Sequence, residues 1–169
     1  MEQILNDLIE SHREEIISFT QELIRYNSVL SEKENHRTEA PFGEAIADAL
    51  QAALEKGQQL GFSPKNVDGY AGVLDMGTSG ELMGAMAHID IVPAGGGWTY
   101  PPFSGTIADG KLYGRGSLDD KGPLAATLYA MKAVDESGLP FRNRFRLIIG
   151  TDEETACRCL AHYLKKEPP

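Results

Sequence analysis

The stretch Arg144–Gly150 constrains the fold more than any other part of this 169-residue sequence. In an extended chain, Phe145, Leu147 and Ile149 point to one face and Ile148 to the other. A strand that is apolar on both faces towards its end is typical of a sheet that is buried on both sides. We therefore expect a buried strand here, within a sheet that helices cover.

Apolar residues at helical spacing predict the helices. The first is one long amphipathic helix from about Ile4 to Tyr26, and the polar run Ser31 to Glu39 that follows it is a loop. A second helix has Pro41 near its first turn and stops at Gly61. Two more are expected, from near Gly122 to Gly138 and from about Ala156 to Lys166.

The strands are predicted where the spacing of apolar residues is no longer that of a helix. They are expected at residues 62–67, 71–76 and 82–88, with a turn at Gly77–Gly80 before the last of these. Asp109-Gly110 predicts a two-residue hairpin between residues 106–108 and 111–113. Helices and strands in this mixed order predict an α/β fold.

The charge and the apolar runs exclude two classes of partner. The formal net charge is −9, whereas nucleic acids and anionic membranes both bind basic surfaces. The longest uncharged run, Ile91 to Ala108, is broken by three prolines and three consecutive glycines, so it cannot span a bilayer. We therefore expect no nucleic acid and no membrane as a partner.

The start of the chain and its cysteines predict a cytoplasmic protein. Met1-Glu2-Gln3 is acidic where a secretory signal would be basic. Only two cysteines occur, Cys157 and Cys159, which is no disulfide framework and fits a reducing compartment.

Three polar clusters follow predicted strands, and the first is His88-Ile89-Asp90. Residues two apart in an extended chain point to the same side, so His88 and Asp90 can share one pocket. A metal-binding imidazole usually donates its other ring N–H to a carboxylate, which fixes its tautomer and orientation. The alternative is a buried histidine that is hydrogen-bonded to a nearby carboxylate, without a metal.

The second cluster is the glycine-rich segment Gly114–Gly122, which contains Asp119 and Asp120. A carboxylate has two oxygens and can bridge two metal ions. The alternative is a loop in which an aspartate caps the helix that begins near Pro123.

The third cluster is Thr151-Asp152-Glu153-Glu154. Three adjacent carboxylates repel one another unless cations are near. Adjacent side chains in an extended chain point to opposite sides, so one glutamate can ligate a metal while the other faces a water molecule. The alternative is an acidic helix N-terminus, which the helix dipole favours.

Taken together, one histidine and several carboxylates at strand ends predict a metal site with nitrogen and oxygen ligands. Such a set suits zinc, and manganese or cobalt are alternatives. One glutamate remains available as a base.

The same motifs resemble those of a known family. They are His88-x-Asp90-x-Val92-Pro93, Asp109–Gly116, Asp119–Gly122 and Asp152-Glu153-Glu154, in this order and at these intervals. They are similar to the co-catalytic zinc metallopeptidases, which include aminoacylase, glutamate carboxypeptidase, succinyl-diaminopimelate desuccinylase and bacterial dipeptidases. Val92–Gly95 and Gly150–Thr155 look most like the peptidase V dipeptidase branch.

The resemblance implies a role for each site residue. His88 would ligate one zinc ion, Asp119 would bridge two, and Glu154 would ligate the second. Asp90 would orient His88, and Glu153 would be the general base. The activity implied is zinc-dependent hydrolysis of an amide bond in dipeptides, in which Glu153 deprotonates a water that the two ions hold. The alternatives are an N-acyl amino acid deacylase or desuccinylase and a non-catalytic remnant.

The resemblance also implies how much of the catalytic domain is present. Residues 1–169 would form the N-terminal portion of a mixed-sheet, phosphorylase/hydrolase-like zinc-peptidase domain, without its lid or dimerisation domain and its C-terminal part. If Asp119 is shared, each ion receives two protein ligands here, whereas catalytic zinc usually keeps three. We therefore expect a truncated chain that a longer polypeptide, a second chain or a homodimer completes, with a dipeptide or an N-acyl amino acid as substrate.

Overall fold

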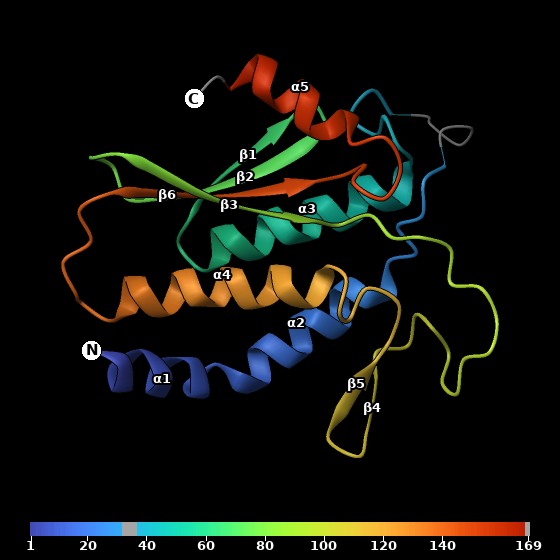
Figure 1. Ribbon diagram of the computed structural model, residues 1–169, viewed down its shortest axis with the longest axis horizontal. Coiled ribbons are helices and arrows are strands. Elements are labelled where there is room, and N and C mark those ends of the chain that lie inside the picture. The colour runs from blue at the N-terminus through green and yellow to red at the C-terminus, as the bar shows by residue number, and fades with distance from the viewer. Residues whose placement is uncertain (32–36, 168–169) are drawn as a thin grey trace.

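The computed structural model describes residues 1–31 and 37–167. The expected loop Ser31 to Glu39 therefore lies partly outside the described residues. The helices and strands, labelled in Figure 1, follow one another as α1 (Glu2–Ser11), α2 (Arg13–Arg25), α3 (Glu44–Gln59), β1 (Ser63–Val67), β2 (Ala71–Met76), β3 (Leu82–His88), β4 (Thr106–Ala108), β5 (Lys111–Tyr113), α4 (Lys121–Glu136), β6 (Arg144–Gly150) and α5 (Arg158–Lys166).

The main sheet is mixed and has the strand order β1-β2-β6-β3. The last strand of the sequence, β6, lies inside it, antiparallel to β2 and parallel to β3. Its expected position inside a sheet is therefore confirmed, as is the mixed α/β fold. Because β3 and β6 are parallel, they end at the same edge of the sheet, where His88 is paired with Gly150.

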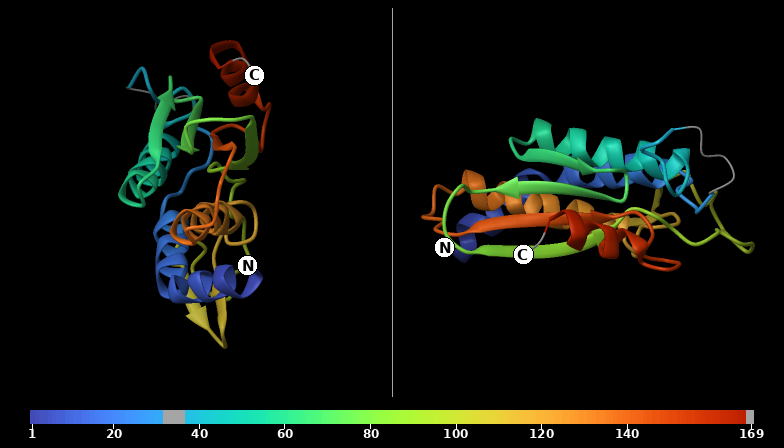
Figure 2. Two further views of the ribbon diagram at one scale, coloured as in Figure 1. Left: turned by 90° about the vertical axis from the view of Figure 1, so that its left-hand side faces the viewer. Right: turned by 90° about the horizontal axis from the view of Figure 1, so that it is seen from above.

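Helices cover both faces of this sheet, but unequally (Figures 1 and 2). Helices α3 and α4 lie side by side on one face, α1 and α2 pack on the outside of α4, and α5 lies on the opposite face. Successive side chains of β2 point to opposite faces of the sheet. Val73 packs with Tyr163 of α5, whereas the side chain of Leu74 lies against Gly57 of α3. A Cβ atom on Gly57 would approach Leu74 to 2.3 Å, so glycine permits this close contact.

The first helical stretch differs from expectation because it is two helices rather than one. Helix α1 ends at Ser11 and α2 begins at Arg13, with His12 between them. The ring of His12 donates a hydrogen bond from Nε2 to Glu136 of α4 across 2.7 Å and lies against Tyr129 of the same helix. Both short helices pack against α4.

The second and last helices both begin later than expected. Pro41 lies in a turn before α3, whose N-cap is Gly43 with a φ of 119°. Helix α5 begins at Arg158 rather than near Ala156, because Cys157 adopts a left-handed conformation. The acidic residues of the third cluster therefore lie in a turn before α5 and not in its first turn.

The hairpin β4–β5 forms a separate two-stranded sheet, with the register expected around Asp109-Gly110. It projects away from the main sheet beyond α2 and α4 (Figure 1). The second polar cluster thus follows a small hairpin and not a strand of the main sheet.

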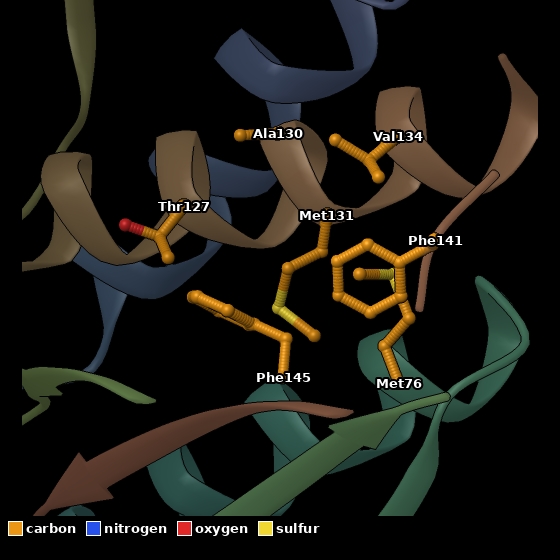
Figure 3. Close-up of a pocket in the computed structure, with 7 residues that line it drawn as sticks. All are labelled: Met76, Thr127, Ala130, Met131, Val134, Phe141 and Phe145. Atoms are coloured by element: carbon orange, nitrogen blue, oxygen red, sulfur yellow. The ribbon is translucent and has the colours of Figure 1, made fainter. Parts of the chain in front are cut away.

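A cavity of about 180 Å³ lies between α4 and the start of β6 (Figure 3). Its lining is apolar apart from one threonine hydroxyl: Met76, Thr127, Ala130, Met131, Val134, Phe141 and Phe145. Met76 is paired with Phe145 at the end of the sheet opposite His88, so this cavity is remote from the polar clusters.

Candidate metal centre

His88 ends β3 with its ring almost fully buried. Its Nδ1 lies 3.0 Å from the backbone carbonyl oxygen of Asp90 and 3.5 Å from Oδ1 of the same residue. Because a carbonyl oxygen only accepts, Nδ1 carries the proton that is donated to it. The other nitrogen, Nε2, then faces Asp119 Oδ1 at 3.1 Å and Glu153 Oε2 at 3.7 Å.

Asp90 connects the two strand ends. It is buried, with 3% of its surface exposed, and its carboxylate accepts the backbone N–H groups of Glu153 at 3.1 Å and Glu154 at 3.0 Å. The turn after β6 is thus held directly beside His88. The expected pocket shared by His88 and Asp90 is present.

Asp119 reaches the site from the loop before α4, and its side chain is 72% exposed. The next residue, Asp120, occupies the N-cap position of α4 but makes no side-chain cap there. Its Oδ2 instead accepts the backbone N–H of His88 across 3.0 Å. The capping alternative for this cluster is therefore wrong for Asp120, whose carboxylate ties the Asp119 loop to β3.

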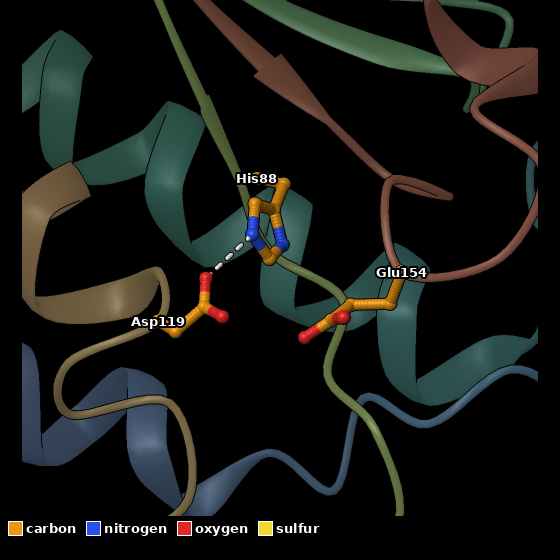
Figure 4. A group of neighbouring side chains, drawn as sticks. All are labelled: His88, Asp119 and Glu154. Atoms are coloured by element: carbon orange, nitrogen blue, oxygen red, sulfur yellow. Dashed lines mark hydrogen bonds and ion pairs between the residues drawn. The ribbon is translucent and has the colours of Figure 1, made fainter.

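The three expected metal ligands come together. One ligand atom from each of His88, Asp119 and Glu154 lies within 4.8 Å of the other two (Figure 4). Two ligand atoms of a tetrahedral zinc ion are about 3.3 Å apart when each bond is about 2.0 Å long. The 3.1 Å between His88 Nε2 and Asp119 Oδ1 fits this spacing, so these residues suit a divalent cation.

Asp152, in contrast, contacts the start of α5 and does not face the site. Its carboxylate accepts hydrogen bonds from the backbone N–H and the guanidinium of Arg158, and it also contacts the Thr155 hydroxyl. Of the three acidic residues in the third cluster, only Glu153 and Glu154 face His88 and Asp119.

The charges at the site act on one another. Burial lowers the pKa of His88, but the hydrogen bonds and charge of Asp90, with help from Asp119, raise it to about 9. Burial, followed by the charge of Asp119, raises the pKa of Glu154. Crowded carboxylates with a protonated imidazole between them are the arrangement that a bound cation would replace.

Residues 26–28, which no sequence motif includes, support the site through hydrogen bonds. Ser28 Oγ donates to the Ile89 carbonyl across 2.7 Å, and the Ile91 N–H donates to the Ser28 carbonyl. Lys121, fully buried, donates from Nζ to the Tyr26 carbonyl across 2.7 Å. Burial lowers the pKa of Lys121 to about 7, although the charge of Asp90 opposes this. Residues 26–28 thus hold both the His88 loop and the start of α4, and no sequence pattern predicts this.

Other candidates lie elsewhere. His162 stacks on Tyr70 and pairs with Asp68, away from the site. Cys157 and Cys159 are both free, and Cys159 is buried in the core.

Comparison with known protein families now identifies the chain. A family model described as peptidase family M20/M25/M40 matches residues 84–169, which is about half of the chain and includes every site residue named above. The chain belongs to this family. The resemblance drawn from the motifs is thereby confirmed at the level of the family, whose peptidases depend on metal ions.

Curated relatives of this M20-family chain include two dipeptidases. The putative dipeptidase YtjP of Bacillus subtilis is 46% identical over 155 residues, which cover 92% of this chain and 33% of that protein. The Beta-Ala-Xaa dipeptidase of Lactobacillus delbrueckii subsp. lactis is 36% identical over 169 residues, or 99% of this chain and 36% of that protein. The chain therefore spans about a third of the length of these relatives.

Solved structures confirm the fold of this M20-family chain. The di-peptidase Dug1p of Saccharomyces cerevisiae matches with a TM-score of 0.82 at 23% identity, over 98% of this chain and 37% of that one. Human carnosine dipeptidase 1 matches with a TM-score of 0.79 at 23% identity, over 99% of this chain and 38% of that one. Among the residues described here, no helix has the length and hydropathy needed to cross a membrane.

Proposed function

We propose that this chain carries part of the two-metal centre of a dipeptidase. The observation that supports the proposal most is the meeting of His88, Asp119 and Glu154 within 4.8 Å, with Glu153 at the same place. Membership of the peptidase family supplies the reaction class, hydrolysis of an amide bond. The relatives named as dipeptidases favour dipeptides as substrates.

His88 and Asp119 would hold one zinc ion, and Asp119 and Glu154 would hold the other. The 3.1 Å between the first two ligand atoms supports this division, as does the ability of the Asp119 carboxylate to use both oxygens. Nitrogen and carboxylate ligands suit zinc, while manganese and cobalt bind the same ligand types. Further ligands are expected from other protein residues, since each ion would have only two ligands among those named here.

When bound, the two cations would lower the pKa of water and polarise the scissile carbonyl. Glu153 would accept a proton from the attacking water and pass it to the leaving amine. Its carboxylate suits this task because it is half exposed, at 48%, and lies 3.7 Å from His88 Nε2. Asp90 keeps the His88 ring in place and fixes the backbone of Glu153 at the same time.

The placement of residues 1–169 as the N-terminal portion of a catalytic domain stays a prediction, as do the cytoplasmic location and the completion of the site by a homodimer or a second chain. The coverage of about a third of the relatives supports the first of these. An N-acyl amino acid deacylase is the alternative that a substrate comparison separates.

Zinc binding tests the proposed centre. Calorimetry should show zinc binding by the wild-type chain and a large loss of affinity in His88→Ala. The matched control is His162→Ala, which removes a histidine that is outside the site and should change nothing. Equal affinity in His88→Ala and the wild type would remove His88 from the centre and end the proposal.

The substrate class is tested with a preparation of this protein that hydrolyses amide bonds. Dipeptides, tripeptides and N-acetyl amino acids are compared at equal concentration. The proposal expects the dipeptides to be cleaved fastest, whereas a clear preference for the acetylated compounds would assign the protein to the deacylases.

A further inference from the structure

The hydrogen bond from His88 Nδ1 to the Asp90 carbonyl decides which ring nitrogen is free to bind a metal ion. Because a carbonyl oxygen only accepts, Nδ1 carries a proton, and Nε2 is the nitrogen that faces Asp119 (Figure 4). The direction of the Asp90 carbonyl therefore sets the orientation of the ring. Residues 89–91 follow β3 and belong to no strand, so contacts outside the sheet have to hold this carbonyl in place.

Ser28 contacts the backbone on both sides of Asp90. Its Oγ donates to the Ile89 carbonyl across 2.7 Å, and its own carbonyl accepts the Ile91 N–H across 3.0 Å. A peptide group is planar, so one hydrogen bond to it restrains the whole plane. The first bond restrains the plane that enters Asp90, and the second restrains the plane that leaves it.

The second of these bonds sets the direction of the Asp90 carbonyl. In a trans peptide, the C=O and N–H groups point in opposite directions within one plane. The Asp90 carbonyl and the Ile91 N–H belong to the same peptide. When this N–H points to Ser28, the carbonyl points away from Ser28, and there it accepts the proton of His88 Nδ1. The contact with Ser28 and the contact with His88 are thus the two ends of one rigid group.

Ser28 is itself held firmly. It is fully buried, with 0% of its surface exposed. Two residues before it, the Tyr26 carbonyl accepts Lys121 Nζ across 2.7 Å, and three residues after it, the Ser31 N–H donates to the Phe42 carbonyl across 3.0 Å. Hydrogen bonds in a buried, poorly polar environment are stronger than in water. The segment can therefore transmit its position to residues 89–91.

We propose that Ser28 is a positioning residue of the metal centre, which orients the His88 ring through the backbone of Asp90. The inference rests on the proposed function, because the orientation of the ring affects metal binding only if His88 is a ligand. The competing role is purely structural. In that case the Ser28 hydroxyl stabilises the fold, and the ring keeps its place without it.

Two measurements on the 169-residue chain separate these roles. NMR spectroscopy of the metal-free chain follows the exchange of the His88 Nδ1 proton with water, and the loss of its resonance in His88→Ala identifies it. Calorimetry measures zinc affinity. In Ser28→Ala, exchange should be about tenfold faster, the factor that corresponds to one typical hydrogen bond. Zinc affinity should fall about tenfold, the lower end of the loss found when the partners of ligating histidines are changed.

The matched control is Thr20→Val. The Thr20 hydroxyl is also buried and also donates to a backbone carbonyl, that of Ile16 across 2.8 Å, but it does so within α2. Thr20→Val should lower stability in urea and change neither readout. If circular dichroism shows Ser28→Ala to be unfolded, Ser28→Cys takes its place in the metal-free measurement, because a thiol is only a weak donor.

Each outcome decides the proposal. Faster exchange and weaker zinc binding in Ser28→Ala support it when Thr20→Val changes neither. An unchanged readout in a folded Ser28 variant overturns it, and so does an equal change in Thr20→Val. Equal zinc binding by His88→Ala and the wild type overturns the proposed function instead, and the exchange rate in the metal-free chain then still shows whether Ser28 orients the ring.

Discussion

The carboxylate of Asp90 accepts the backbone N–H of Glu154 across 3.0 Å and so joins the end of β3 to the turn after β6. Asp90→Asn should lower zinc affinity roughly 10- to 100-fold, since an amide presents one acceptor oxygen where the carboxylate presents two. Calorimetry measures this, with Asp109→Asn as the control because Asp109 is exposed and its φ of 51° suits asparagine. Unchanged affinity in Asp90→Asn would show that the turn holds its position without the carboxylate.

Glu153 and Glu154 are adjacent but should respond differently to the same change. In a preparation that hydrolyses dipeptides, Glu153→Gln should lower kcat by roughly 10²- to 10⁴-fold and leave zinc content intact, because an amide cannot accept the proton. Glu154→Gln should instead lose zinc. Steady-state kinetics and metal analysis of both variants provide the test. Equal loss of metal in the two variants would contradict the division of roles.

Lys121 should matter for stability even though it lies outside the ligand set. Lys121→Met keeps the buried stem but leaves the Tyr26 carbonyl without its donor, which should lower the free energy of unfolding by about 1–3 kcal/mol. Urea unfolding measures the change, and the exposed Lys111→Met is the control. Equal stability of Lys121→Met and the wild type would mean that water or a neighbouring group satisfies Tyr26.

The pair His12–Glu136 should make stability depend on pH. The hydrogen bond to Glu136 raises the pKa of His12, with burial opposing and Glu15 adding to the rise. A pKa that is higher in the folded state stabilises the fold fully below the unfolded value of about 6.5, and this contribution is lost as pH rises through the folded value. The stability difference between the wild type and His12→Gln should therefore be larger at about pH 5.5 than at about pH 9.

Urea unfolding at both pH values measures that difference. A difference that stays constant with pH, or grows with it, would contradict the charged pair.

The free edge of β3 should promote association. Leu82, Met83 and Met86 are 41%, 52% and 42% exposed on a strand that has no partner on its outer side among the described residues, and the strand contains no lysine, glutamate or proline. Uncharged edge strands pair readily with other chains. Met83→Lys should reduce concentration-dependent association in sedimentation experiments. Ile107→Lys, at an equally exposed residue of the β4–β5 hairpin, should not; equal effects would point to general solubility.

Local patterns predicted the strands and the meeting of the site residues. The alternation in β6 and the hairpin at Asp109-Gly110 depend on neighbouring residues, and both appear as expected. His88 and Asp90 share a pocket for the same reason. Glu153 and Glu154 reach the site in a turn, however, and the extended chain assumed for them is wrong.

What the sequence could not predict depends on contacts between distant segments. The break between α1 and α2 lies at His12, whose ring contacts Glu136, more than a hundred residues away. The role of Asp120 depends on the backbone of His88, and that of Lys121 on the carbonyl of Tyr26.

The position of β6 has a consequence for biosynthesis. Among the strands that the structure describes, β6 comes last in the sequence, yet it lies between β2 and β3. During synthesis from the N-terminus, β2 and β3 therefore cannot be joined through β6 until residues 144–150 have been made. Pairing of β6 with β3 also brings His88 beside Gly150, so the Glu153 turn reaches the site only when this pairing forms.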